Sequence, residues 1–166
     1  MFNAYIRTGY NPTHFQQSIT VVLRKQGKSD YQLAKSYRPV ALLNTLGKFL
    51  EAVVARRISY AVETERLLPK THLGGRRGIS TDHAIHNIIN QIKMAWGKGK
   101  PVVSLLMLDV SGAYDNVSHE RLLHNLRKKR LGQLVPWVKA FLSNRSTMIR
   151  MPEGISDSIL TPTGIP

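Results

Sequence analysis

The sequence predicts an α+β fold, because segments rich in β-branched residues alternate with longer segments of helical periodicity. The clearest strands are 18–25, "SITVVLRK", and 38–43, "RPVALL", which flank a polar, basic loop and are expected to form a hairpin. A near-continuous apolar run at 102–109, "VVSLLMLD", has the length of a further strand. With 166 residues, the chain is long enough for one domain with a sizeable core.

Five helices are expected around these strands. In the second of them, Leu46, Leu50 and Val54 recur at helical spacing, and Ser80 is a favoured N-cap residue for the third. The five are expected within 1–16 (with a turn at Asn11-Pro12), from 44–45 to just before 68–69, from 81 to 97, and at about 118–130 and 133–144.

The apolar run at 102–109 predicts a strand that is buried on both faces, although periodicity alone leaves a buried helix open. A hairpin is expected to close the chain at 146–160, with its turn at Pro152-Glu153-Gly154. The chain then ends on an extended segment, "LTPTGIP". This ending indicates a truncated fold rather than a finished one.

The composition favours a polyanionic partner. The chain has 24 Lys and Arg against 10 Asp and Glu, a net charge of +14, which exceeds what solubility requires and points to nucleic acid or an anionic membrane surface. The absence of cysteine excludes disulfides and thiolate metal sites. No apolar run reaches the roughly 18 residues of a membrane span. The N-terminus also lacks a signal-peptide core, so an intracellular protein is expected.

The stretch "LLMLDVSGAYDNV" at 105–117 carries an apolar run out to a carboxylate, Asp109. A carboxylate at the tip of a rigid strand is well placed to bind Mg²⁺, which prefers oxygen ligands. Spacing alone favours a second interpretation, in which Asp109 only stabilises an Asx-type turn. Asp115 could likewise bind metal or cap the next helix, and Tyr114 could pack beneath a nucleotide sugar or anchor the turn.

Two basic segments are candidates for contact with phosphate groups. Lys25 and Arg38 lie on the two strands of the expected hairpin, and the loop 74–78 carries Arg76 and Arg77 on a flexible backbone. For each of these residues taken singly, a solvated basic side chain is the alternative interpretation. The six histidines show no metal-binding spacing, and no G-x-S-x-G elbow supports a serine hydrolase.

Three sequence blocks, in the same order, resemble the reverse transcriptases of non-LTR, LINE-like retrotransposons. "LLMLDVSGAYDNV" resembles motif A, the palm strand that bears the first catalytic aspartate. "VVLRKQGK" with "SYRPVALLNTLGKFLEAVVARRI" resembles the first fingers block, and "HLGGRRGIST" resembles the next block. The resemblance covers residues 18–166, and the particular residues of these blocks are similar to those of elements found in fungi.

The resemblance implies an RNA-directed DNA polymerase with a right-hand fold. This chain would hold the fingers (1–100) and the first part of the palm (101–166). The implied cofactors are two Mg²⁺ ions, and the implied partners are an RNA template, a DNA primer and deoxynucleoside triphosphates, with no membrane partner. A LINE-like element would act in the nucleus.

The same resemblance implies roles for individual residues. Asp109 would bind the metal ions with the help of the Val110 carbonyl, and Tyr114 would be the steric gate against a 2′-hydroxyl. The basic residues would contact phosphates, Arg38 and Lys25 those of the nucleotide, Arg76 and Arg77 those of the template.

Two departures from the family limit these expectations. His72, Gly75 and Ile79 stand where the second block usually has a glutamine, an aromatic residue and an arginine. The family also continues after "TPTGIP" with a Gln-Gly-Ser-Pro block, a Tyr-x-Asp-Asp hairpin and a thumb, and none of these occurs in the 166 residues. The chain is therefore expected to be inactive as a polymerase by itself.

Two other functions stay open. One is a basic remnant that binds nucleic acid and catalyses nothing. The other is a maturase-like reverse transcriptase of an intron or a bacterial retroelement, against which the Leu-Leu-Asn that follows Arg-Pro-Val argues.

Overall fold

The polypeptide folds as two units, one formed by Met1–Val54 with Gly112–Pro166 and the other by Ala55–Ser111. The structure, a computed structural model, describes residues 1–99, 102–152 and 154–165. The expected boundary between residues 100 and 101 lies outside the described residues. Among these residues, no helix is both long enough and apolar enough to cross a membrane.

The first unit contains a mixed sheet of five strands in the order β2-β1-β3-β4, with β5 also paired to β3. The expected hairpin is confirmed, because β1 and β2 are antiparallel, whereas β1 and β3 are parallel. The closing hairpin is confirmed as well, although Glu153 of its turn is outside the described residues. The strands are β1 (Gln17–Arg24), β2 (Tyr37–Leu43), β3 (Ser146–Met151), β4 (Gly154–Ile155) and β5 (Ile159–Leu160).

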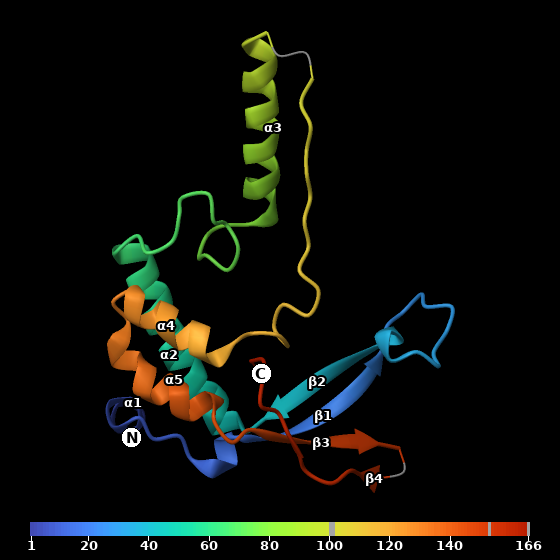
Figure 1. The fold of residues 1–166 in the computed structure, drawn as a ribbon, viewed down its shortest axis with the longest axis vertical. Coiled ribbons are helices and arrows are strands. Elements are labelled where there is room, and N and C mark those ends of the chain that lie inside the picture. The colour runs from blue at the N-terminus through green and yellow to red at the C-terminus, as the bar shows by residue number, and fades with distance from the viewer. Residues whose placement is uncertain (100–101, 153, 166) are drawn as a thin grey trace. The chain divides into compact units, whose positions relative to one another are not determined.

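Three helices of the same unit pack together, namely α1 (Phe2–Thr8), α4 (His119–Lys128) and α5 (Val135–Leu142) (Figure 1). Their core includes Leu123, Trp137 and Leu142, each at least nine-tenths buried. The Trp137 ring stacks on Phe141, with the ring centroids 5.1 Å apart. Gly9, which ends α1, has a φ of 68°, and a Cβ there would come within 2.8 Å of Pro136. The expected positions of all three helices are confirmed to within a few residues.

Helix α2 (Thr45–Thr64) begins in the first unit and ends in the second. Asn44 starts it, because its side-chain oxygen accepts hydrogen bonds from the backbone N–H groups of Leu46 (2.9 Å) and Gly47 (3.3 Å). Leu50 and Val54 are buried on its first half, as their spacing predicted.

Helix α3 (Thr81–Gly97) lies in the second unit and begins with a capping box between Ser80 and His83, so the expected N-cap is confirmed. One face of α3 carries Ile85, Ile88 and Ile89, but none of the residues of α3 is buried. Trp96, for example, is 57% exposed.

The predicted strand at 102–109 is wrong. Residues 102–110 run without helix or strand and pair with none of the strands in the described part of the chain (yellow in Figure 1). Leu106 and Leu108 are more than four-fifths exposed, whereas burial on both faces was expected. An apolar run becomes a strand only where another strand satisfies its backbone N–H and C=O groups, and hydrophobic periodicity does not specify that neighbour.

Candidate functional site

A cleft of about 860 Å³ lies in the second unit, between the last turns of α2 and the loop 74–78, which contains glycines and two arginines. Two segments of the chain form it, and their side chains are mostly polar or basic. The residues that line it are Ala55, Arg56, Ser59, Tyr60 and Glu63 from α2, and Gly75, Arg76 and Arg77 from the loop. We refer to these residues as the arginine cleft.

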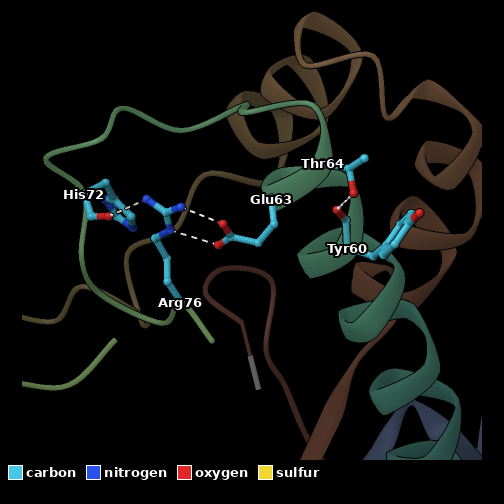
Figure 2. Close-up of polar contacts among 5 residues, drawn as sticks. All are labelled: Tyr60, Glu63, Thr64, His72 and Arg76. Carbon is cyan, nitrogen blue, oxygen red and sulfur yellow. Dashed lines mark hydrogen bonds and ion pairs between the residues drawn. The ribbon is translucent and has the colours of Figure 1, made fainter. Parts of the chain in front are cut away.

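An ion pair joins the two walls of the arginine cleft (Figure 2). Arg76 Nε donates to Glu63 Oε1 at 2.8 Å, and a second guanidinium nitrogen donates to Oε2 at 2.5 Å. Arg76 also donates to the His72 carbonyl oxygen at 3.4 Å. These hydrogen bonds lower the pKa of Glu63 and raise that of Arg76, so both groups are charged at neutral pH. The bidentate geometry fixes the plane of the Arg76 guanidinium relative to α2.

The remaining side chains give the cleft a positive charge and an exposed aromatic ring. Glu63 compensates Arg76, whereas Arg56 and Arg77 form no ion pair within the described residues. Tyr60 is 73% exposed. Arg56, Tyr60 and Glu63 are four and three residues apart, and therefore lie on one face of α2. Guanidinium groups beside an open aromatic ring suit a single nucleic-acid strand, whose phosphates and bases they can bind separately.

Lys25 and Arg38 lie at the loop end of the β1–β2 hairpin in the first unit. Arg38 pairs with Leu23 in the register, and Lys25 follows directly after the end of β1. The Lys25 ammonium donates to the Lys35 carbonyl oxygen at 2.9 Å. Both predicted residues therefore lie at the end of the hairpin that carries its connecting loop.

Asp109, the predicted metal ligand, lies in the unpaired stretch of the second unit and is exposed. Its Oδ1 accepts a hydrogen bond from the Val110 backbone N–H at 2.9 Å, a local contact of the turn type. Tyr114 belongs to the first unit and is 71% exposed. Among the described residues, Tyr114 makes no hydrogen bond or ring contact with Lys25 or Arg38.

The donor atoms at Asp109 suit a hard cation, but they do not complete a site. A carboxylate and a neighbouring carbonyl are oxygen ligands of the kind Mg²⁺ prefers. Across the described residues, however, no three His, Asp or Glu side chains gather in a way that could hold a metal ion. The residues present therefore do not fit a two-ion centre by themselves.

Sequence reasoning identified Arg76 and Arg77 but missed Arg56, Tyr60 and Glu63 of the same cleft. The spacing of these three on α2 was a signal that they share one face. The sequence does not show that the loop 74–78 packs against that face of α2, where Arg76 contacts Glu63.

Glu51, on α2 in the first unit, carries a perturbed carboxyl group. Burial raises its pKa above the usual 4.5, against the opposing effect of the Arg145 and Lys48 charges. A raised pKa in the folded state favours folding at low pH, and this contribution is lost as the pH rises through the folded pKa. The ionised carboxylate therefore disfavours folding at neutral pH.

Glu51→Gln is accordingly expected to raise the melting temperature at pH 7, by about 1–2 °C because Glu51 is only partly buried. The gain should shrink as the pH falls through the folded pKa of Glu51. Thermal melts at several pH values check this, with exposed Glu65→Gln as the control. A lower melting temperature for Glu51→Gln at pH 7 would contradict the argument.

Comparison with known proteins gives consistent matches. The profile of the family described as reverse transcriptase (RNA-dependent DNA polymerase) matches residues 23–166. The probable RNA-directed DNA polymerase from transposon BS of Drosophila melanogaster is 27% identical over all 166 residues, and that from the X-element of the same species is 30% identical. The RNA-directed DNA polymerase from mobile element jockey of Drosophila funebris is also 30% identical.

In each of these three comparisons, the whole of this chain is covered, but it spans only 18% of the length of the relative. All three relatives come from insects, so the expected likeness to fungal elements gains no support.

Proposed function

The chain belongs to the reverse transcriptase (RNA-dependent DNA polymerase) family, and from that premise we propose that it binds the RNA template in a non-LTR retrotransposon polymerase. The observation that carries this proposal is the arginine cleft, in which two uncompensated guanidinium groups and an exposed tyrosine line one open surface. Arg76 and Arg77 would contact template phosphates there. Arg56 and Tyr60 extend that surface along α2.

We further propose that the parent reaction is RNA-templated addition of deoxynucleotides to a primer 3′-end, by phosphoryl transfer that uses two Mg²⁺ ions. Asp109 and the Val110 carbonyl would be this chain's contribution to the metal site. Lys25 and Arg38 would bind the nucleotide triphosphate, and their common position at the loop end of the hairpin supports that role. Tyr114 would be the steric gate. Residues 1–100 would then correspond to the fingers and 101–166 to the first part of the palm.

The chain by itself is expected not to polymerise, because among the described residues no three His, Asp or Glu side chains gather in a way that could hold a metal ion. A primer-extension assay with purified protein, RNA template, DNA primer and Mg²⁺ should give no product above background, and Asp109→Ala should give the same result. Mg²⁺-dependent synthesis that Asp109→Ala abolishes would overturn this expectation.

The alternative is a basic protein that binds nucleic acid only through its net charge of +14. Both functions predict salt-dependent RNA binding that Asp109→Ala leaves unchanged. They differ in where the bound strand lies, and substitutions in the arginine cleft separate them because only the proposed function gives that cleft a special role.

A further inference from the structure

A second cleft, of about 370 Å³, lies in the unit that contains the sheet, and no residue assigned to polymerisation or template binding lines it. Its lining combines hydroxyl groups, one arginine and one carboxylate. The side chains that matter here are those of Ser18 and Thr20 on β1, Thr147 on β3, Arg145 just before β3, and Asp115.

Arg145 is a buried cation, since only 6% of it is exposed. Its side chain has few partners. Its Nη1 donates to the Phe141 carbonyl oxygen at 3.2 Å, and its guanidinium carbon lies 4.8 Å from the centre of the Phe141 ring. Within the described residues, the Arg145 side chain makes no other hydrogen bond and no ion pair, whereas its backbone carbonyl accepts a hydrogen bond from the Thr161 N–H at 2.9 Å. A guanidinium has five N–H donors, so most of those on Arg145 lack a protein acceptor.

The charge of Arg145 is poorly compensated. The carboxyl group that acts on it electrostatically is Glu51, which forms no ion pair with it. Burial raises the pKa of Glu51, and it lowers the pKa of Arg145. Buried charges in proteins are normally paired, because an unpaired one has lost its hydration without replacement. An anionic ligand would supply the missing partner.

The hydroxyl groups of the cleft are available to such a ligand. Thr20 Oγ1 and Thr147 Oγ1 are 2.8 Å apart across β1 and β3. Two further hydroxyl hydrogen bonds in the cleft are long. Thr147 Oγ1 donates to the Ser18 carbonyl oxygen at 3.3 Å, and Ser18 Oγ donates to the Ser146 carbonyl oxygen at 3.4 Å. Long bonds are weak, so these hydroxyls can turn towards a ligand at little cost.

We propose that this cleft binds a phosphate group, held by the Arg145 guanidinium and by the hydroxyls of Thr20 and Thr147. Guanidinium and hydroxyl donors together match the several acceptor oxygens of a phosphate. Asp115, exposed beside the same cleft, repels the ligand and limits its affinity. The phosphate comes either from a free nucleotide or from the 5′-end of a nucleic-acid strand.

Calorimetric titration of the Arg76→Ala/Arg77→Ala protein tests this, because the double substitution removes the competing phosphate contacts of the arginine cleft. The ligands are a nucleoside 5′-monophosphate and one short oligonucleotide with and without a 5′-phosphate. The substitutions added to this background are Arg145→Lys, Thr147→Val and Asp115→Asn. Arg150→Ala is the matched control, since Arg150 is an exposed arginine of β3 that does not line the cleft.

We expect saturable binding of a single phosphate. Arg145→Lys should weaken it about tenfold and Thr147→Val about threefold, and Asp115→Asn should strengthen it about threefold. Arg150→Ala should leave it unchanged. If circular dichroism shows that Arg145→Lys does not fold, the opposite effects of Thr147→Val and Asp115→Asn decide.

A gain in affinity from the 5′-phosphate on the oligonucleotide would identify the strand end as the source. Binding of the mononucleotide without that gain would identify the free nucleotide. Two results would overturn the proposal: absence of saturable binding, or equal binding by the Arg76→Ala/Arg77→Ala protein with and without the added substitutions at Arg145, Thr147 and Asp115. Neither result would affect template binding by the arginine cleft.

Discussion

The double variant Arg76→Ala/Arg77→Ala is expected to bind single-stranded RNA about 10- to 100-fold more weakly than the parent protein at moderate salt. Each arginine that binds a phosphate releases counterions from the RNA, and for single strands each such arginine adds about 0.7 to the slope of log K against log salt. The slope should therefore be about 1.4 shallower in the double variant. Fluorescence anisotropy at several salt concentrations gives both quantities.

The matched control for this variant is Arg121→Ala/Arg127→Ala, which removes the same charge from exposed positions on α4. A site-specific interaction predicts a much smaller decrease in affinity for the control than for the cleft variant. Equal decreases in affinity and equal changes in slope would contradict the account and favour binding through net charge alone.

Leu50→Ala is expected to destabilise the first unit by about 2–5 kcal/mol, because truncation of a fully buried leucine leaves a cavity. Domains of this size are commonly stable by only about 5–15 kcal/mol, so this single change removes a large share of the free energy of unfolding. Urea denaturation followed by circular dichroism measures the decrease.

Leu46→Ala is the control for this second prediction. Leu46 lies one turn earlier on the same helix and is 51% exposed, so its truncation should cost less than about 1 kcal/mol. Similar decreases in stability for the two variants would mean that α2 does not pack as the structure has it.

Most elements of the fold could be predicted because their signals are local. The residues before α2, α3 and α4 are Asn44, Ser80 and Ser118, and each acts as an N-cap as its residue type suggests. The hairpin of β1 and β2 follows from two β-rich segments joined by a polar loop. The parallel pairing of β1 with β3 was beyond such reasoning, since it joins Gln17 to Ser146 across most of the chain.

The apolar run at 102–109 shows where local signals mislead. Its composition indicates a preference for nonpolar surroundings, but neither burial nor strand pairing follows from composition alone. The structure leaves it unpaired and exposed. Asp109 consequently stands at the end of an irregular segment rather than at the tip of a rigid strand.

The candidate site likewise contains residues that could be predicted from local patterns and residues that could not. Arg76 and Arg77 were identified because a glycine-rich loop with two arginines is a recognisable pattern. Arg56 and Tyr60 were not, because a basic or aromatic residue on a helix surface has no distinctive pattern until a second segment faces it.

Photo-crosslinking of bound RNA that contains 4-thiouridine, followed by mass spectrometry of the crosslinked peptides, shows directly whether bound RNA lies in the arginine cleft. We expect crosslinks at Tyr60 and in the loop of Gly75 to Arg77. Unlabelled RNA should suppress these crosslinks, and they should be absent from the Arg76→Ala/Arg77→Ala variant. Crosslinks that concentrate on the basic last turn of α4 and leave the arginine cleft unmodified would contradict template binding in that cleft.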